Sequence, residues 1–458
     1  MNISTLVQSQ KNHFASQQTK DISTRKQLLK KLLSEVIKRE KDIVNALYLD
    51  FKKSEYESVM TETSIVISDL KRTIKKMHHW AKPQSVMPAV LNFPSSSKIY
   101  KEPYGTILII APWNYPYQLA LVPLIGAIAA GNTAVLKPSE LTPNTSKITK
   151  EILEAVFNEK LVAVVEGGVD VSTELLTQRW DYIFFTGSVQ VGKIVAKAAA
   201  QFLTPVTLEL GGKNPCIIDE SAKIKLAAKR IVWGKFINGG QTCIAPDYLL
   251  IHKSVKEKFV MHFKAEIEIA YGNNPEKSTD YPRIINQRNF DRLETMLKNE
   301  NFLVGGNTNR EDNYIAPTLI DEPSLDSEVM KGEIFGPISP VISYESEDDL
   351  EKAISKYEKP LALYVFTKKK SFANKMIAKY SFGGGTINDT TVHFANHNLP
   401  FGGVGESGIG GYHGKQTFDI FCHKKGITKR YNWLDLTIRY APYKGKLKTL
   451  KAFMKLLS

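Results

Sequence analysis

The chain has 458 residues, of which 43% are hydrophobic and 24% are charged, a globular composition in a chain too long for one core. Its 61 basic and 47 acidic side chains give a net charge of +14. The basic residues are dispersed, without zinc-finger spacing or an aromatic RNA-binding signature, which argues against a nucleic-acid partner. Three widely spaced cysteines form neither a disulfide framework nor a metal-binding cluster, so we expect a reducing compartment.

The N-terminal part of the chain predicts helices. Its first residues lack the basic segment and apolar core of a secretory signal, which together with the cysteines favours a cytoplasmic location. From Ser23 onward, apolar pairs recur every four residues between lysines and glutamates, as in an amphipathic helix. The most apolar region, 106–136, is interrupted by prolines, Asn114 and Gln118, so we interpret it as buried core instead of a membrane span.

Short apolar runs alternate with amphipathic stretches after Pro94. These runs cover residues 105–111, 133–139, 161–168, 182–188 and 206–212. Buried strands separated by helices indicate βαβ units and a parallel sheet, the architecture of Rossmann-type dinucleotide-binding domains. A second block, 214–394, mixes strand-like runs such as 248–252 with helical stretches such as 254–270, which predicts another α/β domain. A glycine-dense segment, 399–414, follows as an ordered or mobile loop.

Cys243 is the candidate nucleophile. It lies in the segment NGGQTCIAPDY, where the glycines upstream permit a tight backbone approach and Pro246 limits regular structure. A lone free cysteine is more often a small core hydrophobe, so the surrounding motifs must decide between the two interpretations.

Several segments in this order resemble motifs of the aldehyde dehydrogenase superfamily, and IAPDY resembles its class 3 branch. They are APWNYP (111–116), LKPSE (136–140), FTGSVQVG (185–192), LELGGKNP (208–215), GGQTC (239–243), EIFGP (333–337) and PFGGVGESGIGGYHG (400–414). Because they span about three hundred residues, chance similarity is excluded. The resemblance implies NAD(P)-dependent oxidation of an aldehyde to the carboxylic acid through a thioester on Cys243.

Two further catalytic candidates follow from the chemistry and the resemblance. Asn114, between the first strand and its helix, resembles the family's oxyanion donor, with the backbone N–H of Cys243 as partner; a turn or cap residue is the alternative. Glu209 ends an apolar strand between Leu208 and Leu210, a place where ligand sites gather in α/β sheets. There, desolvation would raise its pKa toward the range of a general base that activates water.

The usual GxGxxG fingerprint is missing after the first strand, and GSVQVG offers another turn for the dinucleotide. A glycine turn that opens a helix can bind phosphate on its N–H groups. By resemblance, the cofactor contacts are Trp113, Lys137, Glu140, Gly187, Ser188, Gly192, Glu333 and Phe335. Glu140 near the ribose 2′-hydroxyl would repel a 2′-phosphate whereas Lys137 would tolerate one, so NAD is favoured and NADP stays open.

The resemblance also predicts the domain organisation. Residues 1–212 would form N-terminal helices and the dinucleotide-binding domain, with dimerisation strands near 85–103. Residues 213–395 would form the catalytic domain, and 396–458 a C-terminal loop, a dimerisation segment and an amphipathic tail. We therefore expect a homodimer.

Two other functions stay open. An acylating dehydrogenase would use coenzyme A to cleave the thioester, but such enzymes generally lack the base that Glu209 provides here. A non-catalytic binding protein on the same fold would not be expected to keep Cys243, Glu209, Asn114 and Glu333 together. Aliphatic, aromatic and terpenoid aldehydes all fit the sequence. No carboxylate or cysteine stands at ligand spacing from His393, His397 and His413, so no metal site is predicted.

The last fifteen residues, 444–458, predict a basic amphipathic helix. Leu447, Leu450, Met454 and Leu457 share one face, with lysines around it. Weak peripheral docking on anionic lipid and packing against the protein's own dimer are equally compatible with this pattern, and the segment is too short for a membrane span.

Overall fold

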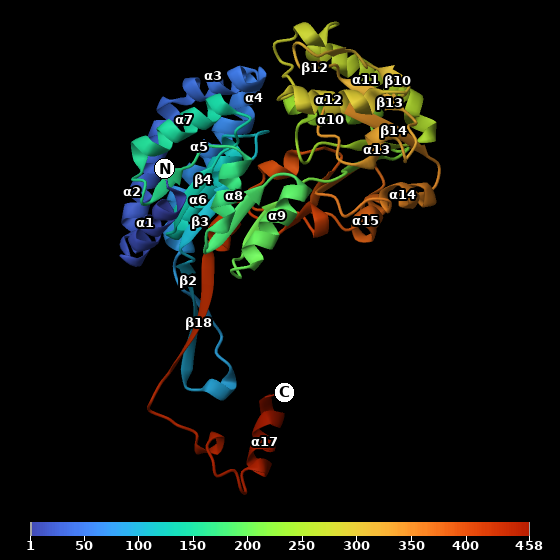
Figure 1. Ribbon diagram of the computed structural model, residues 1–458. Helices are drawn as coiled ribbons and strands as arrows, with labels where there is room; N and C mark the ends of the chain where they lie inside the picture. Colours follow the sequence, from blue (N-terminus) through green and yellow to red (C-terminus); the bar gives the residue numbers. More distant parts are fainter. Residues whose placement is uncertain (1, 458) are drawn as a thin grey trace.

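The computed structural model describes residues 2–457 and has two α/β bodies with a narrow stalk below them (Figure 1). The first body is built on a six-stranded sheet of order β17-β7-β6-β3-β4-β5, in which β17 alone runs antiparallel to its neighbour. Its strands are β3 (Thr106–Ile110), β4 (Thr133–Lys137), β5 (Val162–Val164), β6 (Tyr182–Thr186), β7 (Val206–Glu209) and β17 (Gly408–Ile409). The five strands expected from the apolar runs and their parallel arrangement are confirmed.

Helices cover both faces of this sheet. They are α1 (Ile3–Ala15), α2 (Ile22–Lys38), α3 (Glu40–Phe51), α4 (Glu55–Ser58), α5 (Ser64–Trp80), α6 (Gln118–Ala130), α7 (Pro143–Val156), α8 (Val169–Thr177) and α9 (Val189–Ala200). In α2, Leu29, Leu32 and Val36 are buried, as the spacing predicts. Every residue of α6 is buried, because α2, α5, α16 (Lys415–Ile420) and the sheet surround it. The apolar region 106–136 is therefore core, as predicted.

The second body contains a seven-stranded sheet of order β10-β13-β14-β9-β8-β15-β16, parallel except for β10. Its strands are β8 (Pro215–Ile218), β9 (Tyr248–His252), β10 (Phe302–Val304), β13 (Thr318–Asp321), β14 (Ile338–Tyr344), β15 (Ala362–Phe366) and β16 (Gly384–Ile387). Its helices are α10 (Ile224–Phe236), α11 (Lys256–Tyr271), α12 (Gln287–Leu297), α13 (Glu328–Lys331), α14 (Glu347–Ile354) and α15 (Lys370–Lys379). A short hairpin, β11 (Thr308–Asn309) and β12 (Tyr314–Ile315), lies beside them.

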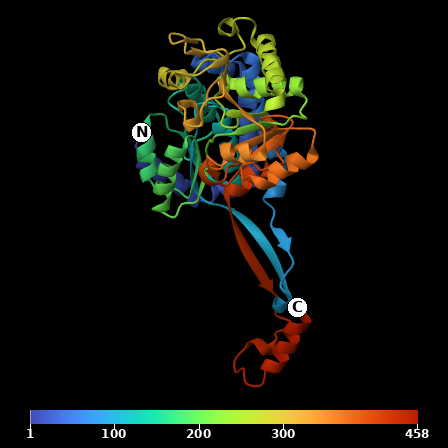
Figure 2. The same ribbon diagram turned by 90° about the vertical axis from the view of Figure 1, so that its right-hand side faces the viewer.

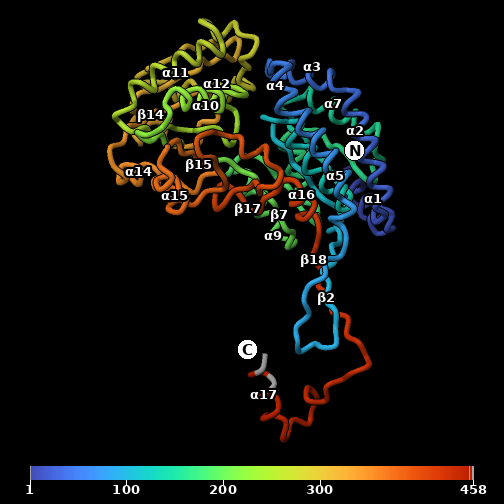
Figure 3. Tube along the Cα trace, turned by 180° about the vertical axis from the view of Figure 1, so that it is seen from behind, coloured from blue at the N-terminus to red at the C-terminus, as the bar shows by residue number. Residues whose placement is uncertain are grey.

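The glycine-dense segment leads the chain back to the first body. Within it, Gly408 and Ile409 form β17 and pair with Glu209 and Leu208, so the segment is ordered and completes the edge of the first sheet. Helix α16 then packs on α6, where Gly126 leaves room for Thr417: a Cβ at Gly126 would lie 2.6 Å from the Thr417 methyl group. Seen from behind, α16, β7 and β17 lie together between the two bodies (Figure 3).

The stalk is a three-stranded antiparallel sheet of order β1-β2-β18. It comprises β1 (Gln84–Val86), β2 (Ser95–Pro103) and β18 (Cys422–Arg430). The view rotated by 90° shows that the stalk projects away from both bodies (Figure 2). The chain ends in α17 (Leu447–Leu457) beyond the stalk, where Leu447, Leu450 and Met454 are exposed. Within the part of the chain that the structure describes, no helix is long and apolar enough to span a membrane.

Candidate active site

The nucleophile loop, residues 237–247, follows α10 and turns sharply before Cys243. Asn238, Gly239 and Gly240 are consecutive left-handed residues with φ of 55°, 61° and 73°. Gly240 is required for a second reason, because a Cβ there would lie 2.3 Å from the carbonyl oxygen of Gly336. The glycines therefore let this loop lie directly against the EIFGP segment, as the tight backbone approach predicted from the sequence requires.

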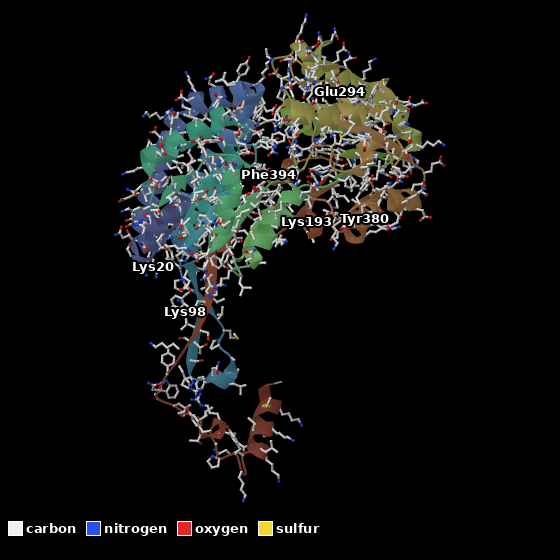
Figure 4. All side chains as sticks on the ribbon, in the orientation of Figure 1. Lys20, Lys98, Lys193, Glu294, Tyr380 and Phe394 are labelled. Atoms are coloured by element: carbon white, nitrogen blue, oxygen red, sulfur yellow. The ribbon has the colours of Figure 1, made fainter. Side chains whose placement is uncertain are left out.

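Cys243 opens into a cavity of about 270 Å³ between the two bodies. Glu209 lines the same cavity from the end of β7. Most of the remaining wall is apolar and includes Met60, Ile65, Leu119, Trp233, Phe394 and Phe401. The structure thus brings the candidate nucleophile and the candidate base into one apolar cavity, and Figure 4 shows Phe394 in the region where the two bodies meet.

Buried amide side chains hold the nucleophile loop in place. The Asn214 side-chain amide donates to the carbonyl oxygens of Cys243 at 2.7 Å and Ala245 at 3.0 Å, and its oxygen accepts from the backbone of Ala362 at 2.8 Å. The Gln241 side-chain oxygen accepts from the backbone N–H of Ile285 at 3.0 Å. These bonds connect the loop to β15 and to the rest of the second body, so the position of Cys243 depends on residues far from it in sequence.

Asn114 is hydrogen-bonded to the nucleophile loop. Its Nδ2 donates to the carbonyl oxygen of Gln241 at 3.1 Å, and its own carbonyl oxygen accepts from Asn238 Nδ2 at 2.8 Å. The neighbouring Tyr115 hydroxyl lies 2.6 Å from Thr242 Oγ1. An amide has two N–H donors, and only one of those of Asn114 is used in these contacts, although Asn114 itself does not line the cavity of Cys243.

The two catalytic candidates have strongly shifted pKa values. Burial raises the pKa of the Cys243 thiol well above its usual range, and Glu333 and Glu209 act in the same direction. Burial also raises the pKa of Glu209 well above its usual value. Both Glu209 carboxyl oxygens are buried and accept no hydrogen bond from any residue that the structure describes. The neutral forms of both groups are therefore favoured, and a proton must move before either can react.

The EIFGP segment lies on the other side of Cys243. Phe335 has φ of 50° and its ring contacts Trp113 edge-on, with centroids 5.2 Å apart. Glu333 packs against Gly211, where a Cβ would lie 2.2 Å from its carboxylate. Burial raises the pKa of Glu333 to about 8, with Asp247 adding to the effect. Its Oε1 accepts no hydrogen bond from the described residues and is free for a ligand hydroxyl group.

The remaining cofactor candidates lie at the carboxyl ends of β4 and β6. Lys137 Nζ is 2.6 Å from Glu140; burial raises the pKa of Glu140, but the hydrogen bond and charge of Lys137, together with a backbone hydrogen bond, lower it overall. Gly187 and Ser188 connect β6 to α9, and the Ser188 side chain caps the helix at the Val191 N–H. A Cβ at Gly187 would lie 2.6 Å from the Phe185 ring, so packing requires glycine there, and the Gly187 N–H donates to the carbonyl oxygen of Glu209 at 3.0 Å. The position of these residues at the carboxyl ends of parallel strands is typical of a dinucleotide-binding site.

Gly192 has a packing role in the structure. A Cβ on it would lie 2.7 Å from the Leu210 side chain, so glycine lets α9 approach the strand that carries Glu209. The Lys137–Glu140 pair and Ser188 do not line the cavity of Cys243; they lie along the edge of the first sheet. The site residues therefore form two groups, one around the thiol and one along this edge.

A buried charge cluster behind Glu333 was not anticipated from the sequence. Lys213 Nζ is 2.7 Å from Asp247 and donates to the carbonyl oxygens of Val329 and Gly332. Asp247 accepts from the Ile334 backbone N–H at 2.9 Å. Lys213 and Asp247 stand inside the motifs LELGGKNP and IAPDY, but only the folded chain shows that they anchor the loop of Glu333. Among residues 2–457, no group of three histidine, cysteine or carboxylate side chains is arranged to hold a metal ion.

Comparisons with known proteins agree with this geometry. Residues 1–427 match the aldehyde dehydrogenase family. The chain is 48% identical over 447 residues to 4,4'-diaponeurosporen-aldehyde dehydrogenase of Staphylococcus aureus, covering 97% of each chain, and 41% identical to the dimeric NADP-preferring aldehyde dehydrogenase of Canis lupus familiaris, covering 97% and 99%. A solved structure described as the substrate-bound state of Staphylococcus aureus AldH is 47% identical, with a TM-score of 0.97 and coverage of 99% and 100%. The chain belongs to the aldehyde dehydrogenase family and is an NAD(P)-dependent enzyme that oxidises an aldehyde.

Proposed function

We propose that the enzyme forms a thioester between Cys243 and an apolar aldehyde, and that water activated by Glu209 hydrolyses this thioester to the carboxylic acid. The observation that carries the proposal is the shared cavity: Cys243 and Glu209 line one apolar space, and both carboxyl oxygens of Glu209 lack a hydrogen-bond donor among the described residues. A nucleophile and a base must both reach the same substrate carbon, directly or through one water.

In the first step, the Cys243 sulfur bonds to the aldehyde carbon and the carbonyl oxygen gains negative charge. The free N–H of Asn114 and the backbone N–H of Cys243 would stabilise this oxyanion. Because burial favours the thiol, its proton must leave as the bond forms, and it passes to a water molecule, so this step does not require Glu209.

Residues along the first sheet and in the EIFGP segment would hold the cofactor. Lys137 and Glu140 would contact the adenosine ribose, Gly187 and Ser188 would face the phosphates, and Glu333 with Phe335 would hold the nicotinamide ribose. The ring of Trp113 contacts that of Phe335 edge-on. When bound, the nicotinamide cofactor supplies the hydride acceptor that converts the Cys243 adduct to a thioester.

Hydrolysis requires water at the thioester carbon. Glu209, which must first lose its own proton because burial favours its neutral form, removes a proton from this water as the oxygen attacks. The carbon–sulfur bond then breaks, Glu209 returns the proton to Cys243, and the acid leaves. Burial raises the pKa of Glu209, so its carboxylate binds a proton more strongly than an exposed one. The apolar wall excludes bulk water, which leaves the Glu209 carboxylate as the main acceptor for the water proton.

Replacement of the base separates the two half-reactions. Glu209→Gln should still give a first burst of reduced cofactor but lower the steady-state rate by about 100-fold or more, because acyl transfer to the enzyme precedes hydrolysis. Glu174→Gln, at an exposed residue of α8 that does not line the cavity, serves as the control. Full steady-state turnover in Glu209→Gln would contradict the assignment. A product that appears only with coenzyme A would instead indicate the acylating alternative.

The cavity supports apolar substrates. Its apolar lining and its volume of about 270 Å³ fit an aliphatic, aromatic or terpenoid chain next to the thiol. A panel of such aldehydes with NAD and with NADP, followed by absorbance of the reduced cofactor, would rank them. Cys243→Ala should abolish aldehyde-dependent reduction of the cofactor with every member of the panel.

We also propose a homodimer formed through the stalk, in which residues 85–103 and the segment after 396 contact a second copy. The exposed side chains of Met87, Leu91 and Phe93 support an interface there, because the stalk has no core of its own to bury them. Under this proposal, residues 1–212 bind the cofactor and 213–395 carry the nucleophile. Light scattering during size-exclusion chromatography should give twice the mass of one chain.

The α17 helix offers one further contact. Leu447, Leu450 and Met454 are 61%, 38% and 54% exposed, whereas the side chain of Leu457 lies outside the described residues. Two alternative contacts would cover this face: weak docking on anionic lipid at the cytoplasmic side, or packing in the dimer. Flotation with anionic vesicles, carried out on the full chain and on a chain lacking residues 445–458, separates the two alternatives, because equal recovery of the two proteins excludes the lipid contact.

The three cysteines are unpaired, which supports a reducing compartment.

A further inference from the structure

A second hollow lies where the stalk joins the first body. It has a volume of about 730 Å³ and lies between α5, the loop before α16 and the beginning of β18. We call it the basic hollow. Its charged lining consists of the cations Arg72, Lys76, Lys415 and Lys424 and one carboxylate, Asp419.

The single carboxylate of the basic hollow is already neutralised. Asp419 forms ion pairs with Lys101 at 2.7 Å and with Lys415. Within the described part of the chain, Arg72, Lys76 and Lys424 form no ion pair, and Nε of Arg72 is buried without a hydrogen-bond partner. Three cations without an ion-pair partner therefore line one open volume, an arrangement that attracts an anion.

Neighbouring titratable groups offset this charge only in part. Asp69 lies one helical turn before Arg72; burial raises the pKa of its carboxyl group to about 7 against the attraction of Arg72, so a fraction of its charge remains at pH 7. Burial lowers the pKa of His413 to about 3 and also lowers that of His397, so both imidazoles are neutral at pH 7. Nδ1 of His413 is buried and has no partner among the residues described, so it can accept or donate one more bond.

One aromatic wall separates the basic hollow from the cavity of Cys243. The ring of His413, which lines the hollow, lies 4.5 Å from that of Phe394 and 5.6 Å from that of Phe401. Phe394 and Phe401 line the Cys243 cavity. The loop between them supplies His397, Leu399 and Pro400 to the hollow, so both spaces share one short segment as their common boundary.

We propose that the basic hollow binds the carboxylate group of an organic acid, and that the acid formed by the enzyme is one such ligand. The inference rests on the proposed function only in naming the source of the acid. An aldehyde is neutral and gains nothing from three unpaired cations, whereas its oxidised product carries the charge that they lack. Arg72 can bind both oxygens of a carboxylate with its planar guanidinium group, and Trp80 offers an apolar surface for the adjoining chain.

Calorimetric titration tests this site directly. Octanoate is the probe and octanol its neutral analogue, with the enzyme saturated with NAD and the ionic strength held constant. Arg72→Gln should weaken octanoate binding about tenfold, since a hydrogen-bonded charge is lost. Lys424→Gln on β18 should weaken it severalfold. Lys75→Gln is the matched control, because Lys75 lies on α5 beside Lys76 but does not line the hollow.

The outcomes are distinguishable. The proposal is supported if Arg72→Gln and Lys424→Gln weaken the affinity for octanoate while Lys75→Gln does not, and if none of the three substitutions changes the affinity for octanol. Equal octanoate affinity in Arg72→Gln and Lys75→Gln overturns it. If Arg72→Gln does not fold, Lys76→Gln and Lys424→Gln give the same decision. Binding is measured without turnover, so its failure is separate from a failure of the thioester mechanism, which Cys243→Ala tests.

Discussion

Two adjacent glycines allow the position of the nucleophile loop to be tested with an internal control. Gly239 and Gly240 have similar left-handed φ values of 61° and 73°. A Cβ on Gly239 would find its nearest neighbour at 3.4 Å, an ordinary contact, whereas a Cβ on Gly240 would lie 2.3 Å from the carbonyl oxygen of Gly336. Alanine at either position therefore introduces the same backbone strain, but only Gly240→Ala forces two backbones apart.

The expected magnitudes follow from these contacts. Left-handed strain costs about 1–2 kcal/mol for alanine, and this term applies to both variants. Gly240→Ala adds overpacking of about 1–3 kcal/mol, because the neighbour is backbone and cannot rotate away. The displaced segment carries Glu333 and Phe335, so Cys243 and the nicotinamide-holding residues separate by a fraction of an ångström to 1 Å. A misplacement of this size lowers the rate by up to about 100-fold.

Urea unfolding and single-turnover kinetics measure the two effects. Gly239→Ala should lose stability but keep a burst rate close to that of the parent enzyme. Gly240→Ala should lose more stability and most of its burst rate. If both variants slow the burst equally, the contact with Gly336 does not set the geometry of the site, and the reasoning is refuted.

Three further predictions follow from charges and exposed side chains. Glu140→Gln removes the charge that repels a 2′-phosphate, so the ratio of kcat/KM for NADP to that for NAD should rise about fivefold; an unchanged ratio would show that Glu140 does not read the ribose. Burial raises the pKa of Asp69 from 3.8 to about 7, so the folded state binds the proton more tightly and its stability falls as pH rises through this range. Asp69→Asn should therefore raise the free energy of unfolding at pH 8 by at most about 4 kcal/mol, and urea melts at pH 4 should show no such gain. Removing residues 445–458 should leave the burst rate unchanged, since α17 lies beyond the stalk, away from both bodies, in Figure 1; a slower burst would place the tail near the site.

The strands and the motif residues were predictable because their signals are local. Runs such as 105–111 and 182–188 are apolar throughout, as strands buried on both faces are, and each became a strand of the first sheet. The resemblance named Cys243 and Glu209, and the structure places them in one cavity. Their roles stay predictions until the variants are measured.

The supporting contacts were not predictable because their partners are distant in sequence. Asn214 bonds to Cys243 and Ala362, which are 29 and 148 residues away. Lys213 and Asp247 are charged residues whose burial only the fold reveals, since charged side chains are normally exposed. The basic hollow likewise combines α5, the loop before α16 and β18, whose lysines look like ordinary surface residues in the sequence.

The pairing of β17 with β7 has a consequence for how the protein is made. During synthesis from the N-terminus, β7 and Glu209 leave the ribosome about two hundred residues before Gly408, which covers that edge. Until then, β7 is an unprotected edge strand that can pair with other chains. Nascent chains stalled before residue 408 should therefore aggregate more readily than chains released after it, and the first body can mature only once the second has been translated.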